Sequence, residues 1–159
     1  MANFIQGTQL RTMNRGNLVT KAAANLPQSA TGTLFTVAGG LVLVTGFLGV
    51  VTTVFQGTDP VLSLGTAPTS GTAATNSLAT TVDTSSTEVG TMMTVQASGG
   101  LGGALVVHAT PAKAGHNVFL SNEFLVNTGT VTWTTGASKT GAMKWYLTYI
   151  PLDDGASVS

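Results

Sequence analysis

The sequence predicts an all-β protein: an antiparallel β-sandwich of jelly-roll-like form, preceded by an extended N-terminal arm. Three observations predict it. From residue 33 onward, short runs rich in Val, Thr and aromatic residues alternate with dividers rich in Gly, Pro, Asn and Ser. Strands this short at this spacing are typical of sandwiches and barrels. No apolar period of 3.6 residues persists for three helical turns.

Residues 1–31 differ from the rest in composition. They are polar and basic, with scattered apolar side chains and no sustained period of 2 or 3.6. A helical turn in "TKAAANL" would end before Pro27, because the residue preceding a proline avoids the helical region. We therefore expect residues 1–31 to form an extended arm that orders on a partner, and residues 32–159 to form the β-sandwich body.

The longest uncharged stretch, "LFTVAGGLVLVTGFLGVVTTVF" over 34–55, is long enough to cross a bilayer as a helix of about 20 residues. However, it contains four glycines and four threonines, and its other residues are largely β-branched or aromatic. It also lacks flanking basic clusters and a Trp or Tyr belt. We predict a strand at "GTLFTV", a turn at Gly39-Gly40 and a strand at "LVLVTGFLGVVTTVFQ". Apolar runs without alternation indicate burial on both faces, within one chain or between subunits. We expect neither a membrane anchor nor a secretory leader.

The later strands follow the same pattern of short runs and turns. "TVTWT" and "KWYLTYI" alternate well, so we expect each of these two strands to have one solvated or interfacial face. The predicted strands are "PVLSLG", "SLATTVD", "TMMTVQA", "ALVVHA", "NVFLSNEFLVN", "GTVTWTT" and "AMKWYLTYI".

Charged residues make up only 8% of the chain, against about 25% in a typical soluble protein. Three basic and no acidic residues precede Asp59, whereas six acidic and three basic residues follow from there, so the two parts carry +3 and −3. A net charge of zero favours association. Basic residues without interleaved aromatics favour docking on an acidic protein surface over nucleic acid. Cysteine is absent, which excludes disulfides and thiolate metal sites.

No residue constellation indicates catalysis. His108 and His116 would need a third ligand, such as Glu123 or Asp83, to hold zinc, and two lone histidines are more often ordinary surface residues. No G-x-S-x-G elbow occurs, and "SGGLGGA" lacks the Lys-Ser/Thr end of a phosphate-binding loop. We expect no enzyme, no metal and no cofactor.

The one adjacent acidic pair lies in "PLDDGAS" near the C-terminus. Asp followed by Gly shortly after a proline is turn chemistry, which we favour here over a calcium site.

The aromatic residues of the last two long strands allow two interpretations. Trp133, Trp145, Tyr146 and Tyr149 could form a platform on which sugar rings stack. We favour the alternative, in which the tryptophans fill the sandwich or a subunit interface.

Three stretches, "GGLVLVTGFLGVVTTVFQG", "ATNSLATTVDTSSTEVGTMMTV" and "GAMKWYLTYIPLDDGAS", resemble a group of small structural proteins of tailed-bacteriophage virions, the capsid decoration or cement proteins. The resemblance covers about residues 33–157. It implies a homotrimer with a β-rich body on the outer surface of the shell of major capsid protein. From the residues alone we expect no contact with nucleic acid or membrane. The alternative is a head-fibre or tail-fibre module that binds host glycan.

The resemblance also gives the N-terminal arm a role, because arms of such proteins bridge neighbouring capsid subunits. The side chains expected to contact the capsid are Phe4, Ile5, Leu10, Arg11, Arg15, Leu18 and Lys21.

Overall fold

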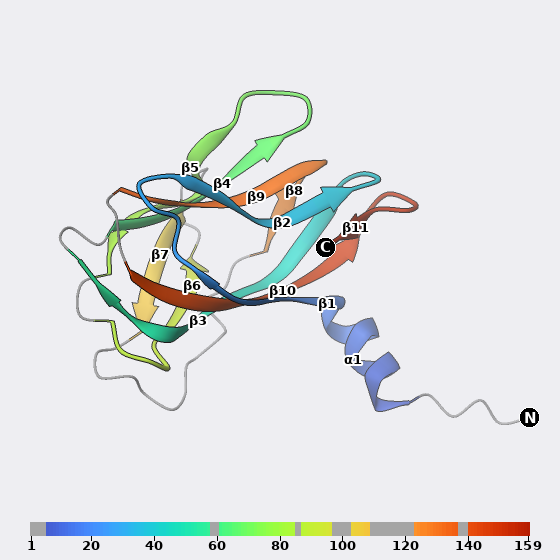
Figure 1. Cartoon of the computed structure of the whole chain (residues 1–159). Coiled ribbons are helices and arrows are strands. Elements are labelled where there is room, and N and C mark those ends of the chain that lie inside the picture. Colours follow the sequence, from blue (N-terminus) through green and yellow to red (C-terminus); the bar gives the residue numbers. More distant parts are fainter. Residues whose placement is uncertain (1–5, 58–60, 85–86, 97–102, 109–122, 137–139) are drawn as a thin grey trace, which may run out of the picture.

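In the computed structural model, two β-sheets pack face to face and a short helix projects from one of them (Figure 1). The structure describes residues 6–57, 61–84, 87–96, 103–108, 123–136 and 140–159. The elements are α1 Gly7–Arg15, β1 Asn17–Asn25, β2 Thr31–Ala38, β3 Val42–Gln56, β4 Val61–Pro68, β5 Ala74–Asp83, β6 Met92–Gln96, β7 Gly103–His108, β8 Phe124–Val126, β9 Gly129–Thr135, β10 Thr140–Pro151 and β11 Ser157–Val158.

The strand pairing is that of a jelly roll. β1 pairs with β10, β2 with β9, β3 with β6 and β4 with β5, all antiparallel, so that the pairs nest within one another along the sequence. One layer has the order β1-β10-β3-β6 and the other has the order β2-β9-β4-β5. This nesting is the product of rolling up one long hairpin, and it confirms the predicted jelly-roll-like sandwich.

The remaining strands extend this framework. β8 pairs with β3 beside β6, and β11 pairs with β2 at the edge of the second layer. β7 links the layers at one side, antiparallel to β6 and parallel to β5. The C-terminus therefore ends within the sheet, where Ser159 and Thr36 exchange two backbone hydrogen bonds of 2.8 and 2.9 Å.

The long uncharged stretch forms β2 and β3, as predicted, with the Gly39-Gly40 turn between them. Both glycines have positive φ, +77° and +145°. Because β2 and β3 belong to different layers, this turn carries the chain from one sheet to the other. A Cβ on Gly39 would lie 2.3 Å from the carbonyl oxygen of Gly155, so only glycine fits this crossing.

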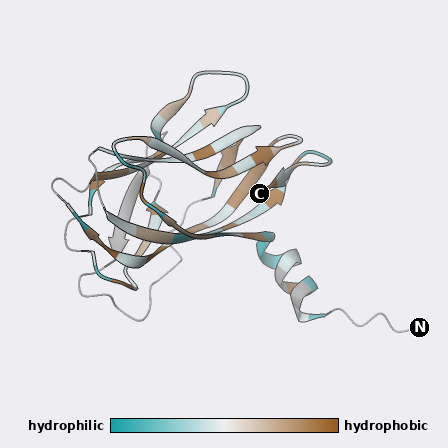
Figure 2. Ribbon diagram, viewed as in Figure 1, coloured by the Kyte–Doolittle hydropathy of each residue, from teal (hydrophilic) through white to brown (hydrophobic). Residues whose placement is uncertain are grey.

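Side chains on the inner faces of the two layers form one core. In Figure 2, brown hydrophobic bands are interspersed with pale bands of near-neutral hydropathy along the strands. Alternation of this kind places one set of side chains in the core between the two layers. The largest completely buried side chains are Trp145, Phe35, Leu34, Leu62, Leu64, Met93, Met143 and Leu147.

The N-terminal segment differs from the extended arm expected over residues 1–31. Residues 7–15 form a helix, and residues 17–25 form the first strand of the jelly roll, which pairs with β10 from Asn17 to Asn25. Ala, Asn and Lys have low strand propensity, and this strand is mostly exposed, so its sequence carries no strand pattern. The backbone of β10 supplies the order instead, and the body begins near residue 17.

Candidate interaction surface

The helix α1 is short and exposes its apolar side chains. It begins after Gln6, whose backbone N–H donates to Oε1 of Gln9 at 2.9 Å. Leu10 and Met13 lie one turn apart and are 57% and 75% exposed. A helix of 9 residues is marginal in water without packing of an apolar face. Met13 was missed by sequence reasoning, although its spacing of three from Leu10 is the available signal.

The C-terminal end of α1 is fixed on the outer side of the β1-β10-β3 sheet. Only Gly16 separates the helix from β1, with φ +84° and its N–H donating to Thr12 O at 2.8 Å. A Cβ on Gly16 would lie 2.2 Å from the carbonyl oxygen of Tyr149, so the backbones are in close contact. The hydroxyl of Thr45 on β3 donates to Arg15 O at 2.7 Å. From this anchor α1 points away from the body (Figure 1).

The outer face of the sheet beneath this anchor is apolar. Register places Leu43 of β3 between Ile150 of β10 and Leu125 of β8. Leu43 faces outward because Val42 and Val44, on either side of it in the strand, are buried in the core, and its two cross-strand partners face the same way. Leu125 is 58% and Ile150 38% exposed. The same logic assigns the whole set, here called the apolar outer face: Leu18, Leu43, Leu48, Val50, Met92, Leu125, Tyr146 and Ile150.

This face carries little charge. Among the side chains that the structure describes, Lys144 is its one charged group, and its Nζ lies 4.9 Å from the ring centroid of Tyr146. Thr148 lies at its centre, and its Oγ1 lies 3.1 Å from Thr45 Oγ1, within hydrogen-bond distance. The strand over 41–56 was expected to be buried on both faces. Within this chain one side is buried in the core, whereas the other faces outward and is partly exposed, so burial of the second side between subunits stays a prediction.

The outer face of the opposite sheet has a different chemistry. Its rows across β2, β9 and β4 consist of hydroxyl and small residues: Thr31, Thr134 and Ser63; Thr33, Thr132 and Gly65; Thr36, Thr130 and Ala67. The hydroxyls of Thr31 and Thr134 lie 2.8 Å apart and share a hydrogen bond. Thr31, Thr33 and Thr36 are exposed on this face, whereas Ser63, Thr132 and Gly65 are buried. The two outer faces of the body are therefore not equivalent: one is hydroxyl-rich and the other is apolar.

The described residues of the predicted arm lie on α1, on the apolar outer face or elsewhere on β1. Leu10 and Arg15 belong to α1 and Leu18 to the apolar outer face, and all three are exposed. Lys21 is exposed on β1. Arg11 belongs to α1, and Phe4 and Ile5 lie outside the described residues.

The predicted interface aromatics lie mainly in the core. Trp133 and Trp145 are 3% and 0% exposed and Tyr149 is 7% exposed, so none of them can form a subunit interface or a sugar platform at the surface. They point inward because their positions alternate with outward residues along β9 and β10. Of the four, Tyr146 alone lies on the apolar outer face.

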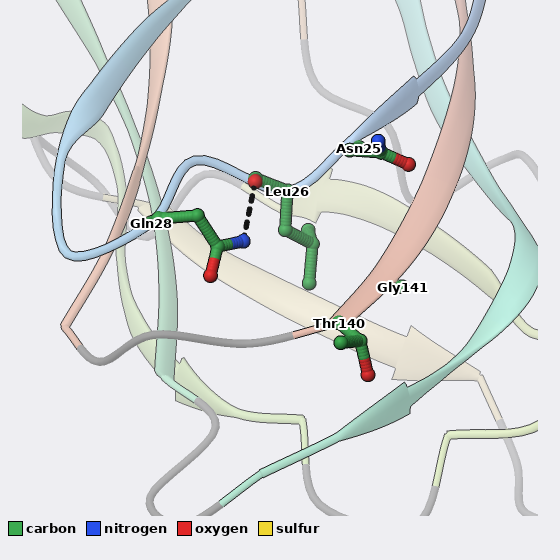
Figure 3. A pocket seen from close by; sticks show the side chains of 5 residues that line it. All are labelled: Asn25, Leu26, Gln28, Thr140 and Gly141. Atoms are coloured by element: carbon green, nitrogen blue, oxygen red, sulfur yellow. Dashed lines mark hydrogen bonds between the residues drawn. The ribbon is translucent and has the colours of Figure 1, made fainter.

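A hollow of about 320 Å³ lies at the other end of the same sheet, lined by Asn25, Leu26, Gln28, Thr140 and Gly141 (Figure 3). The Gln28 amide donates to Leu26 O at 2.9 Å across its rim. No lining residue is ionisable or nucleophilic, so the hollow offers no chemistry beyond weak polar contact.

The remaining sequence candidates bring no metal site together. The part of the chain that the structure describes holds no group of three His, Asp or Glu residues arranged for a metal ion. His116 lies outside the described residues, and the backbone of His108 pairs with Met92. Asp153 lies in a turn and accepts the Leu41 N–H at 2.7 Å, in agreement with the turn predicted there.

No protein-family model, curated protein or solved structure matches this chain. Within the described residues, no helix has the length and apolar character needed to span a membrane.

Proposed function

We propose that this chain is a capsid decoration protein of a tailed-phage virion, which binds the outside of the shell of major capsid protein as a homotrimer and stabilises it. The observation that carries the proposal is the surface formed by α1 and the apolar outer face on an otherwise charge-poor jelly roll. An exposed apolar sheet face promotes aggregation of a free monomer, whereas in an assembly it can be buried against another subunit.

The mechanism is mechanical. Covering apolar area contributes about 25 cal/mol per Å² removed from water, and the low charge avoids costly desolvation at the contact. A trimer that engages several shell subunits at once gains avidity. Because it binds the assembled shell and not separated subunits, it stabilises the shell by mass action. No catalytic step is required, and absence of enzyme activity stays a prediction.

The alternative, a host-recognition module that binds glycan, has less support. Sugar stacking needs exposed aromatic faces, and burial of Trp133 and Trp145 leaves Tyr146 as the aromatic residue on the candidate surface.

The test is co-sedimentation of the purified protein with shells of its own virus that lack it, with shell melting temperature measured in parallel. Decoration predicts saturation at a fixed stoichiometry and a raised melting temperature. The variant Leu125→Asp, on the apolar outer face, should weaken binding at least tenfold, whereas Thr36→Asp, exposed on the opposite sheet, should not. A protein that ignores shells but binds a glycan array would overturn the proposal in favour of the alternative.

A further inference from the structure

We propose that the apolar outer face of one copy is covered by helix α1 of a second copy, so that each copy donates one helix and receives one. The inference rests on the homo-oligomer of the proposed function and assigns both α1 and the apolar outer face to contact between copies. Leu125→Asp would then weaken capsid binding by dissociating the oligomer and removing its avidity. Four features of the described residues support it.

The first feature is that each chain has an apolar helix and an apolar sheet face that both carry exposed side chains. The rest of this face is partly buried, and Thr94, opposite Leu48, is buried. The outer faces of a sandwich are normally polar and solvated, so an apolar outer face indicates contact with another surface. Leu10 and Met13 on α1 and Leu18, Leu125 and Ile150 on the face are each at least 38% exposed. An exchange of helices between identical copies covers both sets with equal numbers, and it closes into a ring when the rotation allows.

The second feature is that α1 cannot cover the face of its own chain. Gly16 is the only residue between α1 and β1, and its backbone lies against the carbonyl of Tyr149. The hydrogen bond from Thr45 to Arg15 O fixes the last turn of the helix at the sheet. Because this anchor leaves no flexible linker, the helix extends outward from its own sheet (Figure 1). This orientation leaves α1 available to another copy.

The third feature is the fit in size. Nine helical residues span about 13.5 Å at about 1.5 Å per residue. The row of Ile150, Leu43 and Leu125 crosses β10, β3 and β8, and β1 adds a fourth strand beside β10. Four strands about 4.8 Å apart make the face roughly 19 Å wide, so one helix fits across it.

The fourth feature is charge. α1 carries Arg11 and Arg15 and no acidic residue. Asp153 and Asp154 lie exposed in the turn after β10, next to the same end of β3, where Asp153 accepts from Leu41 N. Lys144 lies at the far end of the face, where it pairs with Val50. A basic helix seated near Ile150 would therefore meet carboxylates at its rim and avoid the lysine.

The first experiment measures solution mass by light scattering in the absence of capsids. We expect the full-length protein to be an oligomer and Met13→Asp to dissociate at least tenfold more readily. Asn14→Asp is the matched control, since it adds the same charge to the neighbouring exposed position of the helix and should leave the mass unchanged. Circular dichroism checks that both variants stay folded.

The second experiment uses the absence of native cysteine. Leu10→Cys in one tagged full-length chain and Leu125→Cys in another should form a disulfide between the two chains on mixing and oxidation, whereas Leu10→Cys with Thr36→Cys should not. A monomeric wild type, an oligomer insensitive to Met13→Asp, or a Leu10→Cys/Leu125→Cys double variant that closes only within one chain would overturn the helix exchange. A monomer that still saturates capsids would overturn the helix exchange and retain the decoration role. An oligomer that exchanges helices but does not bind capsids would support the exchange and overturn the decoration role.

Discussion

Trp133 and Trp145 meet edge to face across the centre of the sandwich, with ring centroids 6.0 Å apart and planes at 89°. Trp133 lies on β9 and Trp145 on β10, so this contact joins the two layers. Phe47 of β3 extends the cluster, with its centroid 5.2 Å from that of Trp145. Such pairs contribute about 0.5–1.5 kcal/mol beyond the area they bury. Both tryptophans therefore contribute to stability from inside the sandwich, and neither is available at the surface.

Replacement of Trp145 by Ala should lower the free energy of unfolding by about 3–5 kcal/mol, because it opens a large cavity between the layers. Trp145→Phe should cost clearly less, because the phenyl ring fills much of that cavity. Loss of the indole N–H, which is buried without a hydrogen-bond partner among the described residues, leaves nothing unsatisfied in either variant. Urea denaturation followed by circular dichroism measures both. An equal loss in the two variants would show that the cavity between the layers does not set the cost of removing Trp145.

The fold could be predicted from the sequence because most of its strands carry their own signal. β3, β9 and β10 combine β-branched and aromatic residues with turn residues at both ends, and Gly39-Gly40 marks the crossing between the layers. The first strand could not be predicted in this way. Asn17–Asn25 is a strand because β10 offers it a hydrogen-bonding edge, and a composition rich in Ala and Asn does not reveal a partner 117 to 132 residues away.

The candidate surface was only partly predictable for a related reason. The apolar character of residues 41–56 indicated two buried faces, but which side faces the core depends on register, and register is a property of the pairing with β10 and β8. Leu10 and Leu18 were identified as exposed apolar residues. Leu125 and Ile150 were not, because nothing local distinguishes an outward leucine or isoleucine from an inward one.

Gly49→Ala should destabilise the protein by about 1–3 kcal/mol through overpacking. Gly49 lies on the inner side of β3, where a Cβ would lie 2.6 Å from Cζ3 of Trp145 and 2.7 Å from Cε of Met143. Gly7→Ala is the control, because a Cβ there meets nothing within 4 Å. Thermal unfolding distinguishes the two. If Gly49→Ala unfolds at the wild-type temperature, the indole of Trp145 is less tightly packed than described.

Thr45→Val should loosen the anchor of α1 without affecting the core. It removes the hydroxyl that donates to Arg15 O, a contribution of about 0.5–1.5 kcal/mol, so opening of the anchor should become about two- to tenfold more frequent. Brief digestion with trypsin, which cleaves after arginine, reports this as faster cleavage at Arg15. Thr52→Val, exposed on the same strand, should be cleaved at the wild-type rate.

Two truncations should separate the helix from the jelly roll. A chain that starts at Asn17 lacks α1 but keeps β1, so its melting temperature should stay within a few degrees of the full-length value, because α1 buries neither Leu10 nor Met13. A chain that starts at Leu26 also lacks β1, which exposes the edge of β10 and uncovers core residues beside Val19 and Ala24. At about 2–4 °C per kcal/mol for a domain of this size, a loss of several kcal/mol should lower its melting temperature by about 10 °C or more. Equal melting temperatures for the two chains would return the boundary of the body to residue 32 and make β1 dispensable to the fold.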